Sequence, residues 1–389
     1  MLVRTGAGIS ASQTAYLLIL LGAAVVGKRG VRPRADRSLG LVVLIPAHDE
    51  ERQIAGTLES VLASDYPSER RRVLVVADNC SDRTADVARS QGVEVWERRD
   101  LAQRGKGFAL TWAFARLSED ASVAGVCIVD ADCRISANLL SAMAARLGAG
   151  AEAVQAPYLV SNPEESQKSA LRWAGFALFN VVRPLGREQL GMSAGLFGTG
   201  LAMSRGLMRR SPWQAHSYAE DREQHMRWVL DGARVVFAPE AEVTSPATGS
   251  GTGVRARESR WESGRLRLAM TLAPSLLARA VRQREMRALD AALEPILMPQ
   301  SLLAACGLTG VGAALLARDR LSKRLALAAV LGQSVYVIGG LAVTRAPRPV
   351  WAALLTAPRF LAERLGLFGR LLTKGGPTEW ERTPRDRER

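Results

Sequence analysis

The sequence predicts an α/β protein with a mostly parallel central sheet, flanked by apolar helices at both ends of the chain. Between residues 41 and 240, short apolar segments alternate with longer segments in which apolar residues recur every three to four positions. This alternation is typical of parallel strands connected by helices. The first strand segments contain few charges and many β-branched residues, as strands at the centre of a sheet do. A chain of 389 residues is long enough for one large domain or two.

The individual elements follow from the same patterns, taken in chain order. Strands are expected where short apolar runs occur, at 41–46, 72–77, 93–96, 125–129 and 234–238. Helices are expected where apolar residues gather on one face, at 50–64, 84–91, 106–117, 137–147, 164–182 and 219–230. Ser136 is a suitable N-cap for the helix at 137–147. The segment 245–253 is rich in Gly, Ser and Thr and is expected to be a loop.

Three apolar stretches are candidates to enter a membrane: 9–27, 293–317 and 325–343. The stretch 9–27 is marginal in length and diluted by polar residues, so an interfacial or part-buried helix is the alternative there. The first is followed by a cluster of Lys and Arg, as a cytoplasmic flank would be. Loops on the cytoplasmic side of a membrane are enriched in Lys and Arg. The loop between the other two stretches should face outward but carries four positive charges, so the number and orientation of spans stay open. The sequence therefore indicates association with the cell inner membrane, with the α/β part in the cytoplasm.

The chain is strongly basic, with a formal net charge of +14. Residues 255–287 contain nine Arg and three Glu and directly precede an apolar stretch. We interpret this segment as a contact for anionic lipid headgroups. Nucleic acid is the competing partner, but no recognition helix or aromatic-interleaved basic sheet is visible, so none is expected.

Two carboxylates follow the apolar run at 125–129. Asp130 and Asp132 are spaced i, i+2, so in an extended chain their side chains point the same way. Two carboxylates kept this close favour a divalent cation between them. A strand-end Asp followed by a turn Asp is the alternative reading of the same pattern.

Acidic residues also follow other predicted strands or begin helices. They occur in Leu44–Glu51, in Val75–Thr84 and in Ala219-Glu220-Asp221. Since the carboxyl ends of parallel strands share one edge of a sheet, these acids are expected at one rim. No GxGxxG follows the first strand and no GxxxxGK[ST] occurs, which disfavours a dinucleotide-binding fold and a P-loop.

These motifs together resemble the family-two glycosyltransferases, which have the GT-A nucleotide-sugar-binding fold. The matching blocks, in order across residues 40–262, are IPAHDEE, VVADNCSDRTADVA, RGKGFALTWAF, DADC, GLFGTGLAMS, AED and RESRW. The resemblance is greatest to the membrane-attached branch that includes polysaccharide synthases and ceramide glucosyltransferase-like enzymes. It implies a UDP-sugar donor, Mg²⁺ or Mn²⁺ as cofactor, and inversion at the anomeric carbon.

The resemblance also implies roles on the donor side. Asp78 would accept the N3–H of uracil, although an Asx-turn would also explain it. The uridine pocket would be lined by Pro46, Ala47 and Glu50. The diphosphate end would be formed by Lys106, by Asp130 at the sugar or ribose and the metal, and by Asp132 at the metal, with Arg260 bracing the pyrophosphate.

On the acceptor side, Asp221 would be the general base, although acids at a helix start also complement the helix dipole. His225, one turn further, is better explained as a packing residue. Acceptor contacts would come from Trp261, Gly198, Thr199 and Glu220. Arg257 stands where polysaccharide synthases usually carry Gln, which favours transfer of one or a few sugars.

We therefore expect an enzyme that transfers a hexose or N-acetylhexosamine from a UDP-sugar to a lipid or lipid-linked glycan. The alternatives are a processive polysaccharide synthase subunit and a catalytically silent membrane scaffold. The expected division is an anchor and basic flank (1–38), a GT-A catalytic domain (39–262), a basic interfacial segment (263–292), a transmembrane hairpin (293–345), and an interfacial helix with a polar tail (346–389). The sequence does not indicate the sugar, the acceptor or the oligomeric state.

Overall fold

The computed structural model describes residues 2–27, 37–247, 263–316 and 319–357. Its centre is a seven-stranded sheet with the order β3-β2-β1-β4-β8-β6-β9. Strands β3, β2, β1 and β4 are mutually parallel, as are β6 and β9, whereas β8 runs antiparallel to both of its neighbours. The predicted mostly parallel sheet is confirmed. The strands are β1 (Leu41–Ala47), β2 (Arg71–Asp78), β3 (Glu94–Arg98), β4 (Gly125–Ile128), β6 (Ala153–Gln155), β8 (Leu201–Ser204) and β9 (Val235–Phe237).

A second, three-stranded sheet lies beside the first, with the order β5-β10-β7. Its strands are β5 (Arg134–Ile135), β7 (Tyr158–Val160) and β10 (Val243–Ser245). The sequence patterns did not predict β5, β6, β7, β8 or β10, because two to four residues are too few to show a period.

Helices cover both faces of the large sheet, and the side chains of β1 show why. Val42 and Leu44 point into one core, where they meet α4, and Val43 and Ile45 point into the other, where they meet α2 and α5. Both faces are therefore buried, which is why β1 reads as a continuous apolar run. The surrounding helices are α2 (Ile54–Leu62), α3 (Thr84–Ser90), α4 (Lys106–Leu117), α5 (Leu139–Gly148), α8 (Arg205–Arg210) and α9 (Glu220–Leu230).

Two helices begin later than the sequence indicates. Helix α2 starts at Ile54 rather than at residue 50. The residues just before it are hydrogen-bonded to the start of α3 instead, since Thr84 Oγ1 accepts from the Glu50 N–H at 2.7 Å. Helix α5 starts at Leu139, and Ser136 is not its N-cap. The Ser136 hydroxyl instead accepts from the Glu242 N–H at 3.0 Å, tying the helix start to the strand β10 region.

The helix expected at 164–182 is longer at its far end. Helix α6 (Gln167–Ala177) begins after Ser166, whose hydroxyl accepts from the Ser169 N–H. It continues through a π-helical segment, Leu178–Val182, into α7 (Arg183–Gln189). Pro184 lies just after the π-helical segment and does not interrupt this path.

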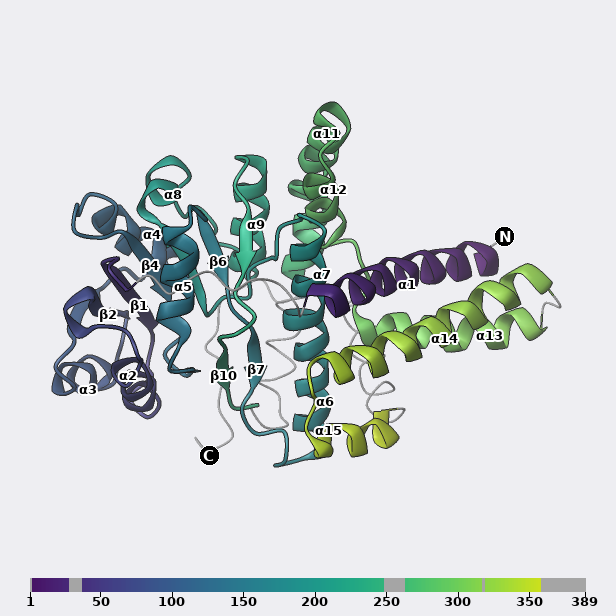
Figure 1. Cartoon of the computed structure of the whole chain (residues 1–389), viewed down its shortest axis with the longest axis horizontal. Helices are drawn as coiled ribbons and strands as arrows, with labels where there is room; N and C mark the ends of the chain where they lie inside the picture. Colours follow the sequence, from purple (N-terminus) through teal and green to yellow (C-terminus); the bar gives the residue numbers. More distant parts are fainter. Residues whose placement is uncertain (1, 28–36, 248–262, 317–318, 358–389) are drawn as a thin grey trace.

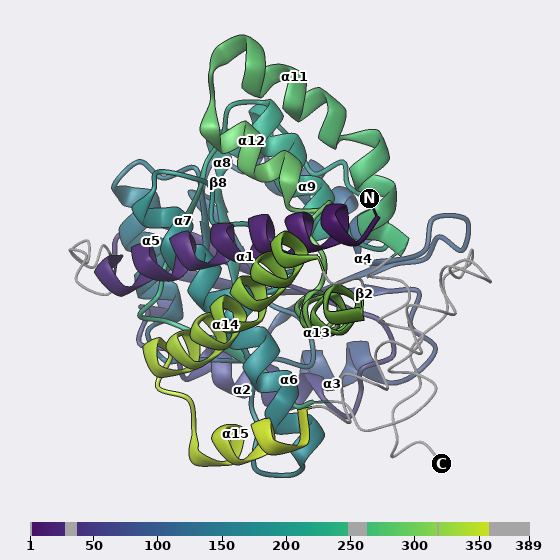
Figure 2. The ribbon, with the colours of Figure 1, turned by 90° about the vertical axis from the view of Figure 1, so that its right-hand side faces the viewer.

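Three apolar helices form a bundle that extends sideways from the α/β domain (Figure 1). They are α1 (Leu2–Gly27), α13 (Gln300–Leu316) and α14 (Arg320–Val343), and each contacts the other two. The helix expected at 293–317 is interrupted, since α12 (Met286–Leu293) ends before Pro295 and α13 starts after Pro299. Viewed along the bundle, α11 (Ala273–Gln283) and α12 lie on one side of α1, and α15 (Arg348–Ala353) lies beyond α14 on the other (Figure 2).

Close helix contacts join α1 of the bundle to α7 and to α14. A Cβ added to Gly186 of α7 would lie 2.3 Å from the Leu20 carbonyl oxygen of α1, and one added to Gly332 of α14 would lie 2.6 Å from Thr14 Cγ2. Small residues allow such backbone approach. Within the described residues, α1 and α14 are the two helices long and apolar enough to cross a membrane by length and composition. Helix α13 is shorter.

Candidate active site

The acidic residues predicted at one rim do lie at the carboxyl ends of neighbouring parallel strands. Strands β2, β1 and β4 pair in register, and they end at Asp78, Ala47 and just before Asp130, respectively. Pro46 and Ala47 pair with Val76 and Ala77 of β2, so the predicted uridine-lining residues sit next to Asp78.

Asp78 is held by a basic residue that the sequence analysis missed. Arg98 is the cross-strand partner of Asp78 on β3, and its Nη1 donates to Asp78 Oδ1 at 2.6 Å. Both side chains are buried. His48 Nδ1 lies 2.7 Å from the Asp78 carbonyl oxygen, which fixes the strand end from the other side. Strand β3 also carries Glu94 and Glu97, so the charge of Arg98 did not distinguish it in the sequence.

The loop that follows β1 is fastened to the loop that follows β2. Asp49 has φ 52°, a left-handed conformation that Asp tolerates, and its carboxylate accepts from the Ser81 N–H at 2.7 Å. Glu51 N–H donates to Asp82 at 3.1 Å. Asp49 thus has a structural role, since its carboxylate joins the two loops.

Lys106 is the centre of the diphosphate side. Its Nζ lies 2.5 Å from Asp130 Oδ1, donates to the Gly198 carbonyl oxygen at 2.6 Å, and lies 4.0 Å from Glu220 Oε1. The predicted residues of β4, of the Gly-rich segment and of α9 therefore converge on one ammonium group. Asp221 belongs to the same cluster, because a Cβ added to Gly198 would lie 3.7 Å from Asp221 Oδ2 and 3.5 Å from Lys106 Nζ.

Thr199 has a supporting position. It is fully buried, and its hydroxyl accepts from the Asp130 N–H at 3.1 Å. Its side chain therefore orients the end of β4, whereas the Gly198 backbone lies at the cluster itself. The glycine has φ 81°, which explains why this position lacks a side chain.

Burial governs the ionisation of this cluster. It raises the pKa of Asp130 and of Asp221, and it raises the pKa of Glu220 to about 7, against the opposing charge of Lys106. Burial lowers the pKa of Lys106, but the neighbouring carboxylates outweigh it, so the net pKa is raised. Lys106 therefore stays charged, while the acids bind protons more tightly than in water.

The donors at the end of β4 fit a hard divalent cation. Donor atoms of Asp130, Asp132 and Cys133 lie within 4.8 Å of one another. The carboxylate oxygens suit Mg²⁺ or Mn²⁺. Cys133 does not suit them, because burial raises the pKa of its thiol well above the ordinary value and keeps it protonated. A second group, Asp49, Cys80 and Asp82, is engaged in the loop contacts described above.

The remaining predicted residues divide into two groups. Arg257, Arg260 and Trp261 lie outside the described residues. His225 is buried, its Nε2 lies 2.9 Å from Ser193 Oγ, and burial lowers its pKa to about 4. It is therefore a neutral packing residue, as expected.

A buried charge cluster behind α9 was also missed. Arg187 of α7 lies 2.9 Å from Asp290 Oδ2 and 3.2 Å from Glu294 Oε2, and it donates to the Tyr16 hydroxyl of α1 at 3.3 Å. Its partners are 100 or more positions away in sequence, so no local sequence pattern predicts these contacts. The cluster joins α1, α7 and α12 directly beneath the site.

The sheet order, the strand-end acids and the Lys106 cluster define a GT-A nucleotide-sugar-binding fold. Residues 39–264 match the family described as glycosyltransferase like family 2. The chain belongs to this family.

Similar proteins agree with this assignment. The chain is 29% identical over 228 residues to a protein named probable glycosyltransferase YdaM of Bacillus subtilis, a match covering 51% of this chain. The chain spans about half the length of that relative, 49%.

Among solved structures, a mannosyltransferase of Pyrobaculum calidifontis, in complex with GDP-Man and Mn²⁺, has a TM-score of 0.50 at 19% identity; the match covers 86% of this chain and 99% of that one. Glucosyl-3-phosphoglycerate synthase of Mycobacterium tuberculosis, in complex with Mn²⁺, UDP and its product, has a TM-score of 0.39 at 19% identity, covering 63% and 82%.

Proposed function

We propose that this chain is a membrane-associated, metal-dependent, inverting glycosyltransferase. It transfers a hexose or N-acetylhexosamine from a UDP-sugar to a lipid or lipid-linked glycan. The observation that carries the proposal is the convergence of Asp130, Gly198 and Glu220 on Lys106, with Asp221 beside them. A cation, a strand-end acid and a helix-borne acid gathered at one point support a binding site for the diphosphate end of the donor.

On the donor side, Asp78 accepts the uracil N3–H, while Arg98 keeps that carboxylate ionised and oriented. Pro46, Ala47 and Glu50 line the uridine pocket. Asp130 and Asp132 hold Mg²⁺ or Mn²⁺, which when bound neutralises the charge of the departing diphosphate. Lys106, which is hydrogen-bonded to Asp130, adds a second positive charge, and Arg260 adds a third.

On the acceptor side, Asp221 takes the proton of the acceptor hydroxyl as its oxygen attacks the anomeric carbon. The new carbon–oxygen bond forms, the bond from that carbon to the β-phosphate oxygen breaks, and UDP leaves with the electron pair. The raised pKa of Asp221 supports this role, because a base is most effective when its pKa lies near the working pH. Glu220 and Trp261 contact the acceptor.

Helices α1 and α14 support membrane association, and so does the basic segment 263–292 that leads into α13. In this arrangement residues 1–38 form an anchor, 39–262 the catalytic domain in the cytoplasm, 293–345 the membrane hairpin, and 346–389 an interfacial tail. Together with α13 and α14 of the hairpin, α1 would make three membrane helices.

The test is turnover of a UDP-sugar panel with Mn²⁺ and a total membrane lipid extract, with products identified by mass. We expect one or a few sugars added to a lipid. Asp221→Asn should abolish transfer, whereas Asp86→Asn, an exposed acid on α3, should not. Long glycan chains would favour a processive synthase. No UDP binding by calorimetry at any metal concentration would favour a silent scaffold and refute the proposal.

A further inference from the structure

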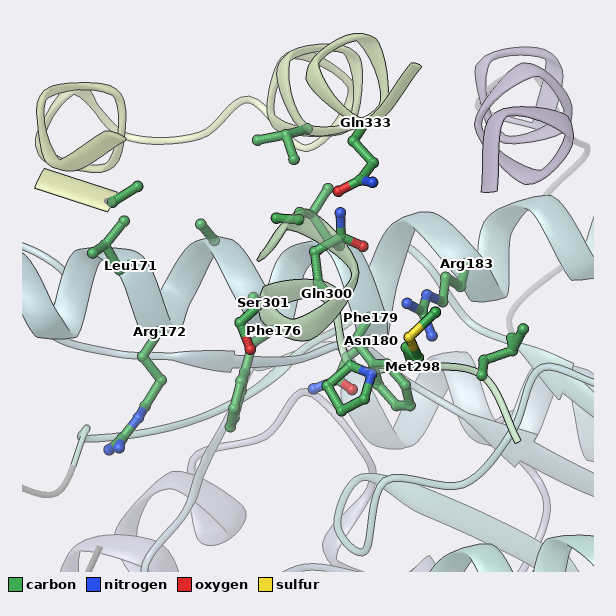
Figure 3. Close-up of a pocket in the computed structure, with 18 of the residues that line it drawn as sticks. Leu171, Arg172, Phe176, Phe179, Asn180, Arg183, Met298, Gln300, Ser301 and Gln333 are labelled. Atoms are coloured by element: carbon green, nitrogen blue, oxygen red, sulfur yellow. The ribbon is translucent and has the colours of Figure 1, made fainter. Parts of the chain in front are cut away.

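A cavity of about 640 Å³ lies between α6 and the helices α13 and α14. Figure 3 shows Leu171, Phe176 and Arg183 along the α6–α7 path, with Gln300, Ser301 and Gln333 on the facing helices. Its volume is in the range of pockets that enclose small molecules. Most of its lining is apolar.

The cavity begins at the active site. Asp221, the proposed base, lines one end together with Phe197, which directly precedes Gly198. A molecule in the cavity therefore presents one end to the group that removes the acceptor proton.

The cavity also reaches the outer surface of the helical bundle. Leu308 of α13 and Ile338 of α14 both line it, and they are 58% and 53% exposed, respectively. Helix α14 is long and apolar enough to cross a membrane, and α13 is a shorter apolar helix beside it. Apolar side chains exposed on these helices provide an entrance from the lipid phase. A hydrocarbon chain can thus enter without crossing water.

Two guanidinium groups line this cavity beside the Phe179 ring. The Cζ atoms of Arg183 and Arg222 lie 4.8 and 5.0 Å from the centre of the Phe179 ring. Arg183 is only 5% exposed, and its Nε has no hydrogen-bond partner. Among the described residues, neither arginine forms an ion pair within 4.0 Å. The nearby Glu294 is already engaged by Arg187.

Two carboxylates interact electrostatically with the buried Arg183, those of Asp290 and Glu294, and both are ion-paired with Arg187. Burying a guanidinium whose charge is only partly compensated is costly, and a bound anion offsets that cost. We propose that the acceptor is an anionic lipid: its hydrocarbon chain lies between α6 and α13–α14, its anionic group lies at Arg183 and Arg222, and its hydroxyl lies at Asp221. This rests on the proposed function and narrows its acceptor. The bond changes are those given above, with the lipid hydroxyl as nucleophile and its proton passing to Asp221.

One pair of variants tests the chain site. Gly175 lines the cavity, and a Cβ added there meets no atom within 4 Å, so Gly175→Leu fills the space without strain. Gly312→Leu is the matched control, because Gly312 is also helical and open but does not line the cavity. Both changes favour helix.

The probe is a series of 1-acylglycerol 3-phosphates of increasing chain length, bound to the full chain in phosphatidylcholine nanodiscs. In the parent protein and in Gly312→Leu, affinity should rise with chain length. In Gly175→Leu that rise should be lost, with at least tenfold weaker binding of the longest chain. An unchanged rise would mean that another occupant, such as a second copy of the chain, covers the cavity, and would overturn the inference.

A second comparison tests the anionic group. Arg222→Gln should weaken binding of the acylglycerol phosphate at least tenfold and leave a neutral monoacylglycerol of equal chain length unaffected. Equal losses for both lipids would overturn the assignment of charge. Calorimetry of UDP with Mn²⁺ on the same samples separates the proposals: donor binding without chain-length dependence refutes only the lipid site, and lipid binding without donor binding refutes only the enzyme.

Discussion

Arg98 Nη1 lies 2.6 Å from Asp78 Oδ1, and the two residues face each other across the paired strands β2 and β3. The ion pair is buried, so neither charge is compensated by water. The same guanidinium also donates to the Gln103 carbonyl oxygen at 2.9 Å. Arg98 therefore links the proposed uracil-binding carboxylate to the loop that leads into α4 and Lys106.

Removing Arg98 should impair both stability and donor binding. Arg98→Met leaves Asp78 buried without a cation, which costs about 3–5 kcal/mol in comparable pairs. We expect a large loss in the free energy of unfolding and at least a tenfold rise in KM for the UDP-sugar, measured by denaturant unfolding and by initial rates.

The matched control is Arg89→Met. Arg89 pairs with Asp86 and Glu97 on the surface, where such pairs contribute about 0.2–1 kcal/mol. Equal losses in the two variants would show that the Asp78–Arg98 pair has no special role.

Asp132 and Cys133 should differ in their effect on metal dependence. Asp132→Asn weakens a hard oxygen donor, and we expect the Mn²⁺ concentration at half-maximal rate to rise about 10- to 100-fold. Cys133→Ala should leave that concentration unchanged, because a buried neutral thiol is a poor ligand for Mn²⁺. A metal titration of both variants decides the ligand set, and an effect of Cys133→Ala would contradict our assignment.

Glu220 should make the metal-free protein less stable as pH rises. Its pKa is raised from 4.5 to about 7, so between these values the folded state binds more protons than the unfolded state. Its contribution to stability therefore falls as pH rises from 4.5 to 7. Glu220→Gln lacks this loss, and its advantage in unfolding free energy should grow across that window, to on the order of 1 to 3 kcal/mol. Parallel stability curves for parent and variant would refute the shifted pKa.

The contact between α1 and α7 should be intolerant of a single methyl group. In Gly186→Ala the new Cβ would lie 2.3 Å from the Leu20 carbonyl oxygen, so the helices must separate. We expect a loss of about 1–3 kcal/mol, as overpacking usually costs. Gly22→Ala is the control, since its Cβ would meet nothing within 4 Å. Thermal unfolding in detergent compares them.

The sequence predicted those features that depend on patterns among residues close together in the chain. Helix α4 was predicted to the residue, and Asp130, Glu220 and Asp221 were placed at strand ends or helix starts by alternation alone. The contacts that define the site depend on distant segments instead. The contact of Arg98 with Asp78 depends on the register of β3 against β2. The contact of Gly198 with Lys106 depends on the fold of a segment that has no periodic sequence pattern.

The cavity illustrates the same limit. Phe179 and Arg183 look like one face of an amphipathic helix, and only the position of α13 and α14 turns that face into an enclosed space. The interruption between α12 and α13 was also missed. The prediction relied on the number of apolar residues in this stretch and gave too little weight to Pro295 and Pro299, which break helices.

The contact of Gly186 with Leu20 has a consequence for how the protein is made. Helix α1 is synthesised before its partners α7 and α14, which follow about 160 and 290 residues later; at roughly 5–20 residues per second this means tens of seconds for α14. During that interval the apolar side chains of α1 lack the α14 surface that they contact in the folded protein. The three-helix bundle can therefore close only after every strand of the large sheet, the last of which ends at Phe237, has been synthesised.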